Sequence, residues 1–461
     1  MIIHTLFSCD GRLEPGQVEV KLLPGIPQLH IVGLPDASIR ESGIKVKSAL
    51  RSAGFQWPIG QQIVVSLRPA GGRKSGAGVE LAIALAYLAM SGQLPRGLEQ
   101  AVMTHAVFGE LGLNAEVIAP TEIARALLAG ERPLLTGPVP DRVREGEWIE
   151  LAYLGAGSVH KERRAFDWSN HWRPPSFEGM HLHDRAAKAL LLTAHMRLGV
   201  LVAGPQGTGK STWAKMAHAL SGPPDPKELL EREALILEDK PPRWRPLEQP
   251  HHTTSVLGMV GGGLPLVPGV ITRAHGGILL MDEFLEFHPL VLEALREPME
   301  VGSIELARKG RREKFPARFQ LIGTTNLCPC GRLNPLSSRA CNYALGRCRA
   351  TIQRMSGPLL DRFDMLVLSH EWMADGRLWS WTELKEHLDQ LREFRAKRSD
   401  EIKIPDHYLR LGLNHRRRKS LAKVARGLAD IDRSLEVRPN HLRLAHDWVE
   451  VSMMKLRDVF A

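Results

Sequence analysis

The stretch RLGVLVAGPQGTGKST, residues 197–212, decides the fold of this chain. Its first half is an apolar run typical of a buried strand, and its second half contains Gly204, four further residues and then Gly209-Lys210-Ser211. A helix-type run, WAKMAHALSG, follows at once. The phosphate-binding pattern GxxxxGK[ST] requires this strand–loop–helix context. The stretch therefore predicts the nucleotide-binding core of a P-loop NTPase.

The residue types of this loop explain how it would hold a nucleotide. Glycines let the backbone curl so that its N–H groups face the phosphates, and the N-terminus of the following helix adds a favourable dipole. Lys210 would reach the β- and γ-phosphates, and Ser211 would bind Mg²⁺. We expect the whole loop to line the site: Gly204, Pro205, Gln206, Gly207, Thr208, Gly209, Lys210, Ser211 and Thr212.

Polar residues that follow two later apolar runs complete this prediction. In GGILLMDEF, residues 276–284, four apolar residues precede Asp282 and Glu283. A buried strand that ends in adjacent acids would place Asp282 near the metal and Glu283 where it can polarise the attacking water. FQLIGTTN, residues 319–326, predicts a further strand, and Asn326 at its tip could orient the same water.

The chain of 461 residues is long enough for two to four domains. Residues 1–172 alternate strand-type and helix-type runs, and the polar, proline-containing stretch 156–180 predicts a linker or boundary. In residues 173–375 apolar strands alternate with helices, which predicts an α/β domain with a mostly parallel sheet. Residues 376–461 contain only helix-type runs and predict a small helical module.

Charge and hydropathy narrow the class of protein. A formal net charge of +10 favours polyanionic partners. No apolar run reaches the ~18–20 residues that a membrane span needs, and the first residues lack the pattern of a secretory signal. We therefore expect a cytoplasmic protein without a membrane partner.

Three motifs carry a resemblance to a known family. They are HHTTSVLGMVGGGLPLVPGVITRAHGGILLMDEF at 251–284, TTNLCPCG at 324–331 and MSGPLLDRFD at 355–364. Together with residues 1–55 they resemble the ComM/YifB family of magnesium-chelatase-like AAA+ ATPases, and the resemblance covers nearly the whole chain. It implies an AAA+ P-loop core, an N-terminal α+β domain similar to the Lon protease domain, and a C-terminal helical lid.

The resemblance also implies a hexameric ring with ATP at the subunit interfaces. In this family an arginine of the LLDRFD motif, here Arg362, reaches into the neighbouring subunit's site. Such a group stabilises charge on the transferring phosphoryl. A second sensing arginine is expected on the helical lid. The spacing from VARGLADI, residues 424–431, places it at Arg416, with Arg426 as the alternative.

The segment VGSIELARKGRREKFPARFQL, residues 301–321, resembles a β-hairpin that projects into the central channel of related ring motors. Cations at its tip would follow a DNA phosphate backbone without reading sequence. LGMVGGG, residues 257–263, resembles a second insertion on the pore side. The hairpin cations are Arg308, Lys309, Arg311 and Arg312.

The N-terminal segment KSGAGVELAIALAYL, residues 74–88, resembles the Lon region that carries the nucleophile. Aligned by its helix, the nucleophile position falls on Gly76, with Ser75 one residue away, and the partner lysine would lie near Pro120. A Ser–Lys dyad is thus missing, and Ser75 has no base to activate it, so we expect no peptidase activity. The domain would serve assembly or DNA handling, or simply present a solvated helix face, through Arg40, Lys45, Lys47 and Arg51.

Four of the five cysteines, Cys328, Cys330, Cys341 and Cys348, lie within 21 residues. In a cytosolic protein such a cluster indicates a metal site more often than disulfides. Four thiolates can form the closed tetrahedral set of structural Zn²⁺. Reduced free thiols are the alternative, and His370 is a poor substitute ligand.

These residues and the resemblance predict an ATP-driven hexameric DNA motor that uses ATP and Mg²⁺, with Zn²⁺ as a structural ion. The family likeness points to branch migration of recombination intermediates, for example in natural transformation. Two other functions stay open: the motor subunit of a magnesium chelatase, and an AAA+ remodeller of proteins. DNA stimulation of ATP hydrolysis would separate the first function from the other two.

Overall fold

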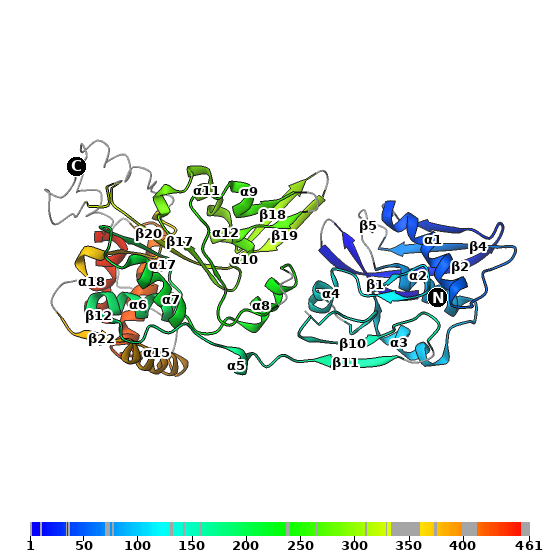
Figure 1. Ribbon diagram of the computed structural model, residues 1–461, viewed down its shortest axis with the longest axis horizontal. Helices are drawn as coiled ribbons and strands as arrows, with labels where there is room; N and C mark the ends of the chain where they lie inside the picture. Colours follow the sequence, from blue (N-terminus) through cyan, green and yellow to red (C-terminus); the bar gives the residue numbers. More distant parts are fainter. Residues whose placement is uncertain are drawn as a thin grey trace. The chain divides into compact units, whose positions relative to one another are not determined.

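The computed structural model describes residues 2–9, 12–33, 35, 37–69, 74–75, 78–129, 132–141, 143–156, 159–236, 240–263, 266–308, 311–328, 330–332, 360–372, 376–398 and 413–452 (Figure 1). The chain divides into two compact units. Unit 1 comprises Met1–Asn170, Pro226–Pro241 and Glu305–Lys314. Unit 2 comprises His171–Asp225, Pro242–Ile304 and Phe315–Ala461.

Unit 1 begins with a five-stranded sheet of order β3-β4-β2-β1-β5. Its long central hairpin is antiparallel, whereas β3 runs parallel to β4. Helix α2 packs against β2 and α1, and its residues from Glu80 to Leu88 are buried, as its apolar sequence predicts. The elements are β1 (Ile2–Cys9), β2 (Arg12–Pro24), β3 (Leu29–Val32), α1 (Ala37–Ser52), β4 (Gln61–Arg68), β5 (Lys74–Ser75) and α2 (Glu80–Met90).

A second sheet of unit 1 has the order β11-β10-β9-β6. Residues 156–180, predicted as a linker or boundary, contain the division between the two units after Asn170. They also contain a strand that the sequence did not predict, because residues 160–164 form β11 and pair antiparallel with β10. The elements here are η1 (Arg96–Leu98), α3 (Glu99–Thr104), β6 (Ala106–Val107), β7 (Glu110–Leu111), β8 (Val117–Ile118), α4 (Ile123–Ala129), β9 (Leu134–Thr136), β10 (Gly146–Glu150), β11 (His160–Arg164) and α8 (Pro226–Glu233). Helix α5 (Trp168–His171) follows at the boundary.

Unit 2 is built on a five-stranded sheet of order β14-β17-β20-β13-β21. All four strand pairs are parallel, so the predicted parallel sheet is confirmed. The inner strands are buried along their whole length, as expected where helices cover both faces. The strands are β13 (Val200–Ala203), β14 (Leu247–Glu248), β17 (Ile278–Met281), β20 (Gln320–Thr325) and β21 (Met365–Leu368).

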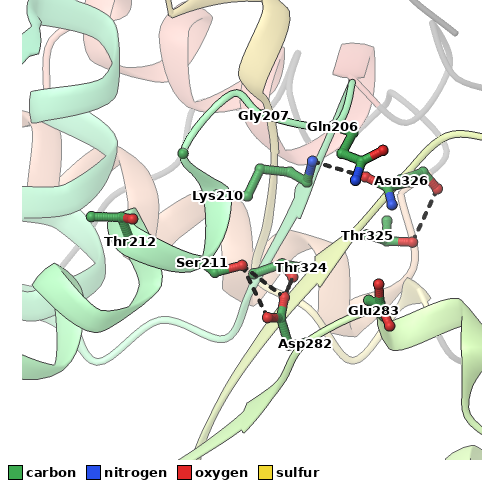
Figure 2. Close-up of a pocket in the computed structure, with 11 residues that line it drawn as sticks. Gln206, Gly207, Lys210, Ser211, Thr212, Asp282, Glu283, Thr324, Thr325 and Asn326 are labelled. Carbon is green, nitrogen blue, oxygen red and sulfur yellow. Dashed lines mark hydrogen bonds between the residues drawn. The ribbon is translucent and has the colours of Figure 1, made fainter. Parts of the chain in front are cut away.

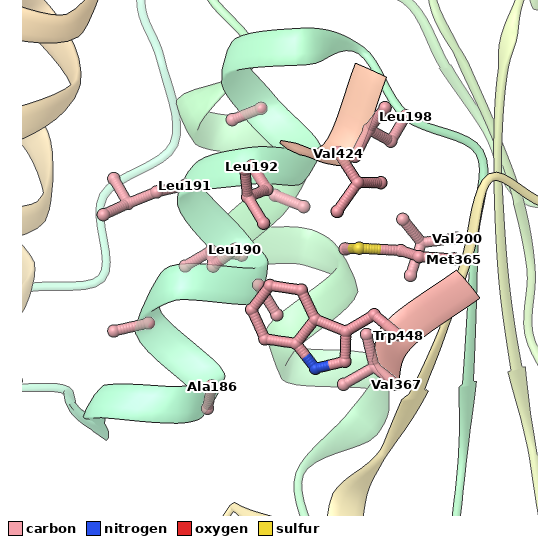
Figure 3. Packing of buried hydrophobic residues seen from close by; sticks show 14 of the residues in the cluster. Ala186, Leu190, Leu191, Leu192, Leu198, Val200, Met365, Val367, Val424 and Trp448 are labelled. Atoms are coloured by element: carbon pink, nitrogen blue, oxygen red, sulfur yellow. The ribbon is translucent and has the colours of Figure 1, made fainter. Parts of the chain in front are cut away.

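One hydrophobic core joins this sheet to helices from both ends of unit 2. Figure 3 shows Leu190 of α6, Val200 of β13, Met365 of β21, Val424 of α17 and Trp448 as members of this core. The helix-type runs predicted after residue 376 therefore form helices that share a core with the sheet. The helices are α6 (Asp184–Met196), α7 (Lys210–Leu220), α15 (Trp381–Ala396), α17 (His415–Ile431), α18 (Pro439–His446) and the π-helical turn η4 (Asp447–Val451).

Smaller elements complete the described chain. They are β12 (His181–His183), α9 (Val256–Val260), β15 (Gly261–Gly262), β16 (Val267–Pro268), α10 (Val270–Arg273), η2 (Phe284–Glu286), α11 (Pro289–Ala294), α12 (Arg296–Val301), β18 (Ser303–Arg308), β19 (Arg311–Pro316), η3 (Ser369–Glu371) and β22 (Leu378–Ser380). Among the helices that the structure describes, none is both long enough and apolar enough to cross a membrane.

Candidate functional site

The loop between β13 and α7 takes a conformation that favours glycine. Gly207 and Gly209 both have a φ of 80°, in the left-handed region that residues with a Cβ avoid. Gly209 is also the N-cap of α7, so this turn aims the helix N-terminus at the loop. A side chain at Gly204 would collide with Ser369. The predicted phosphate-binding loop is therefore a strand–loop–helix turn with its backbone curled as the motif requires.

Lys210 lies at the first position of α7 with only 8% of its surface exposed. Its Nζ donates hydrogen bonds to the carbonyl oxygens of Gly204 (3.1 Å) and Pro205 (2.6 Å). It also donates to Oδ1 of Asn326 at 3.1 Å (Figure 2). Burial lowers the pKa of Lys210, and the charge of Asp282 opposes that shift. The ammonium group is thus held at the mouth of the loop by neutral oxygens, which phosphate oxygens can replace.

Ser211 and Asp282 meet although 71 residues separate them. The Ser211 hydroxyl donates to either carboxylate oxygen of Asp282, at 3.0 Å in each case. Thr324 of β20 also donates to Asp282 through its hydroxyl. A hydroxyl and a carboxylate are hard oxygen donors of the kind that Mg²⁺ binds beside nucleotide phosphates. This pair therefore fits the metal that a P-loop nucleotide carries.

Glu283 and Asn326 lie on the same side of the cleft as Asp282 (Figure 2). Glu283 has a left-handed backbone, with φ of 54°, and a side chain that is 54% exposed. Its Oε2 lies 3.4 Å from Nδ1 of His252, which the sequence did not suggest as a neighbour. The carboxylate of Glu283 is thus within reach of a water molecule in the cleft, which is what a general base needs.

The cleft has a volume of about 280 Å³. Its lining includes most of the residues predicted for the nucleotide and the metal: Gln206, Gly207, Gly209, Lys210, Ser211, Thr212, Asp282, Glu283, Thr324, Thr325 and Asn326. Thr208 turns its hydroxyl away, toward the carbonyl of Pro205 (3.0 Å) and the hydroxyl of Ser369 (2.7 Å). Gly204 and Pro205 contribute their carbonyl groups to Lys210.

Arg362 and Arg416 approach the same carboxylate, that of Glu300 in α12. The closest guanidinium nitrogens lie 3.4 Å and 3.9 Å from its Oε2. Neither arginine lines the cleft around Lys210. Burial, and then the charges of Arg416 and Arg296, lower the pKa of Arg362. The pair is therefore a concentration of positive charge outside the chain's own nucleotide cleft.

Arg426, the alternative to Arg416, has a different place. It is 2% exposed, and its guanidinium donates to Asp430 (3.1 Å) and to the carbonyls of Leu435 (2.8 Å) and Ser434. These bonds hold the end of α17 and the turn that follows. The structure gives Arg426 a packing role, whereas the side chain of Arg416 is 34% exposed.

Comparisons with known proteins identify the family of this chain. Residues 177–375 match the family "Magnesium chelatase, subunit ChlI", and residues 18–133 match "Subunit ChlI of Mg-chelatase". YifB of Salmonella typhimurium is 30% identical over 494 aligned residues, which cover 96% of this chain and 96% of that protein. The chain belongs to the ComM/YifB family.

Two further relatives bear on function. Competence protein ComM of Haemophilus influenzae is 29% identical over 494 residues, with 96% of each chain covered. The probable DNA helicase MCM9 of Arabidopsis thaliana is 30% identical over 191 residues, 38% of this chain and 24% of that protein. As a magnesium-chelatase-like AAA+ protein, this ComM/YifB member is an ATPase that works with ATP and Mg²⁺.

The hairpin of this ComM/YifB member is formed by β18 and β19, as predicted. Arg312 is exposed, with its side chain 71% accessible and a guanidinium nitrogen 3.8 Å from Glu305. Arg308 and Arg311 lie in the two strands, but their side chains, and the whole of Lys309, lie outside the described residues. Of the predicted DNA-contacting cations, Arg312 is thus the one whose exposure the structure defines.

The cysteine cluster is described only in part. The sulfur atoms of Cys328 and Cys330 converge to 3.0 Å, somewhat closer than the roughly 3.8 Å between two thiolates on one tetrahedral zinc. Cys341 and Cys348 lie outside the described residues, where the proposed four-ligand set would be completed. Among the residues that are described, no group of three or more His, Cys, Asp or Glu side chains is arranged to hold a metal ion. Zinc therefore stays a prediction.

In unit 1 apolar side chains pack against Gly78, whereas the predicted nucleophile position Gly76 lies outside the described residues. Phe108 and the ring of Pro120 lie so close to Gly78 that a Cβ there would meet them at 2.6 Å and 2.9 Å. Lys45 binds the buried carboxylate of Glu80 at 3.4 Å, and Lys47 lies over the ring of Trp57. Arg51 is exposed, whereas the side chains of Arg40 and Ser75 lie outside the described residues.

Proposed function

We propose that this protein is an ATP-driven DNA motor that assembles as a hexameric ring and moves the branch point of recombination intermediates. The observation that carries the proposal is the nearly full-length similarity to a competence protein, combined with a nucleotide cleft whose lysine, hydroxyl and carboxylates are all in place. The natural setting would be the integration of DNA taken up in transformation.

Each residue of the cleft has a proposed task. Lys210 would leave the carbonyls of Gly204 and Pro205 to bind the β- and γ-phosphates, since a charged acceptor competes well with neutral ones. Ser211 and Asp282 would hold Mg²⁺ directly or through its water. Glu283 would take a proton from the attacking water, and Asn326 would orient that water.

Arg362 and Arg416 would act on the nucleotide of the neighbouring subunit. Both lie outside the cleft of their own chain, and both are tied to Glu300. An anion presented by a neighbour would relieve the repulsion between them. Loss of such an arginine costs ~10³–10⁵ in turnover in other phosphoryl-transfer systems. Hydrolysis would therefore depend on ring assembly.

DNA would be held by the exposed cations of the β18–β19 hairpin. Arg312 projects from β19 with most of its side chain in solvent. Contacts of this kind bind phosphates without sequence preference and weaken with salt. Unit 1 fits an inactive Lon-like domain in this proposal, because the region beside Gly78 is packed with Phe108 and Pro120. The helices α15, α17 and α18 would be the lid.

The proposal is tested by ATP hydrolysis and by branch migration on forked and three-way DNA. DNA should stimulate hydrolysis by the wild-type protein severalfold. Lys210→Ala and Glu283→Gln should abolish both activities, whereas Lys215→Ala and Glu286→Gln, matched substitutions at exposed positions of α7 and η2, should keep them. Hydrolysis that no form of DNA changes would contradict the DNA role.

A metal-insertion motor is the second candidate, because the family matched by residues 177–375 is described as a magnesium chelatase subunit. A chelatase motor would hydrolyse ATP without regard to DNA, and its activity would respond to a porphyrin and partner proteins instead. The same hydrolysis assay separates the two functions. The hairpin cations and the similarity to a competence protein favour the DNA motor.

A further inference from the structure

A chain of hydrogen bonds links the phosphate-binding loop to the end of strand β21. The Thr208 hydroxyl donates to the carbonyl oxygen of Pro205 at 3.0 Å and lies 2.7 Å from the hydroxyl of Ser369. A hydroxyl has a single proton, so Ser369 must be the donor in the second bond. The Pro205 oxygen also accepts from Lys210 at 2.6 Å. Ser369 is therefore three hydrogen bonds away from the phosphate-binding ammonium group.

Ser369 is fixed tightly beneath the loop. Its side chain occupies the space where a Cβ of Gly204 would lie, and the residue is 1% exposed. It directly follows Leu368, the last residue of β21, which pairs with Ala203 at the end of β13. The two strands thus end side by side, one in the phosphate-binding loop and the other in the serine that supports it.

The opposite end of β21 carries the segment of Arg362. Asp364, the residue just before β21, accepts hydrogen bonds from the backbone N–H of Gly199 (3.0 Å) and the hydroxyl of Ser420 (2.8 Å). Lys423 lies 3.7 Å from the same carboxylate. Arg362 is two residues earlier in the chain. The four residues of β21 therefore separate Asp364, which anchors the segment of Arg362, from Ser369.

Helix α17 holds this segment from the other side. Arg417 is 5% exposed and donates to Oδ1 of Asp361 (3.1 Å) and to the carbonyls of Leu360 (3.1 Å) and Phe363 (3.3 Å). Arg362 thus lies between two residues whose groups are fixed to α17. A shift of β21 along its axis would be transmitted to Arg362 and would not be absorbed by a flexible loop.

We infer that Ser369 is a positioning residue that couples the chain's own nucleotide cleft to Arg362 through β21. The inference rests on the proposed function, because it takes Arg362 as the group that serves the neighbouring site. When Lys210 turns to the phosphates, Pro205 keeps the bond from Thr208. Ser369 then supports the loop together with the backbone bonds from Gly204 to Thr325 (3.2 Å) and from Gln206 to Gly331 (2.6 Å). In the described sheet β21 is an edge strand paired only with β13, so its displacement would disturb ladder bonds on one side alone.

The experiment compares two buried serines at the two ends of β21. Ser369→Ala removes the bond to the loop, and Ser420→Ala removes the bond to Asp364, so each deletes one hydroxyl from a buried site. The affinity for a fluorescent ADP analogue is measured at equilibrium, and hydrolysis is measured in single turnovers at saturating ATP. We expect Ser369→Ala to weaken ADP binding about five- to tenfold, the effect of one buried hydrogen bond, and Ser420→Ala to leave it within twofold.

Both variants should also slow single-turnover hydrolysis severalfold, although Arg362 is intact in each. In an Arg362→Ala background, Ser369→Ala should still weaken ADP binding but should slow hydrolysis no further. Thr208→Val, which removes the hydroxyl that joins Ser369 to Pro205, should reproduce Ser369→Ala.

Three results would overturn the coupling: unchanged ADP affinity in Ser369→Ala, an equal loss in Ser420→Ala, or a slowing by Ser369→Ala that persists without Arg362. Failure of the proposed function gives a different pattern. If Arg362→Ala alone leaves hydrolysis unchanged, the interface role of that arginine is wrong, while the ADP measurement still reports whether Ser369 supports the loop.

Discussion

Asp430 is a fully buried carboxylate that joins three helical segments of unit 2. It accepts hydrogen bonds from Arg398 at 2.7 and 2.8 Å and from Arg426 at 3.1 Å, and it lies 2.9 Å from Nε2 of His195. Burial alone would raise its pKa, but the bonds to His195 and Arg398 prevail and lower it from 3.8 to about 2. The negative charge of Asp430 therefore contributes to the attachment of α17 to α6.

The substitution Asp430→Asn keeps the shape of the side chain but leaves two buried guanidinium groups without this carboxylate. Breaking a buried ion pair in this way costs about 3–5 kcal/mol. The lowered pKa gives a separate figure, since a shift of nearly two pKa units corresponds to roughly 2–3 kcal/mol. Both figures predict a drop in Tm of roughly 5–15 °C for a unit of this size.

The assay is urea and thermal unfolding at pH 7, followed by tryptophan emission. Asp432→Asn is the matched control, because the side chain of Asp432 is 54% exposed, although it lies 3.0 Å from Nε2 of the buried His441. The pKa of Asp430 is depressed in the folded state, so its stabilisation is complete above about pH 4 and is lost as the pH falls toward 2. The gap between wild type and Asp430→Asn should shrink over that range. A Tm change no larger than that of Asp432→Asn would refute the reasoning.

Three other outcomes follow from the structure. Burial lowers the pKa of Lys210, and bound phosphate favours its charged form. The affinity for ADP should therefore fall with rising pH, at a pH below the ~10.4 at which an ordinary lysine titrates. An affinity that stays constant from pH 7 to 10 would contradict this. Arg312→Ala should weaken DNA binding severalfold and reduce the salt slope by about one, whereas Lys385→Ala on α15 should not. Metal analysis should find one zinc per chain, lost in the Cys328→Ser/Cys330→Ser variant, and active zinc-free protein would exclude a structural zinc.

The parallel sheet of unit 2 and the shape of the phosphate-binding loop could be predicted because their causes are local in sequence. Short apolar runs alternating with helix-type runs leave a parallel sheet as the simple arrangement. Gly207 and Gly209 take left-handed conformations that few other residues adopt. The meeting of Ser211 with Asp282 also follows, since the parallel strands of one sheet bring their carboxyl ends to the same edge, and only β20 separates β13 from β17. Strand β11, in contrast, is a polar run, HKERR, with no apolar alternation to reveal it.

The supports around the cleft could not be predicted, because they depend on distances that no local pattern encodes. Glu300 contacts Arg362 and Arg416, which lie 62 and 116 residues further along the chain. Ser369 reaches Thr208 across 161 residues, and a serine that follows a strand is an ordinary residue in an ordinary place. The sequence motif identifies the groups that contact the phosphates. The edge strand β21 positions Ser369, which supports the loop that carries those groups. Residues such as Ser369 should therefore affect nucleotide affinity and turnover together although they touch no substrate, which is the behaviour that the paired serine variants measure.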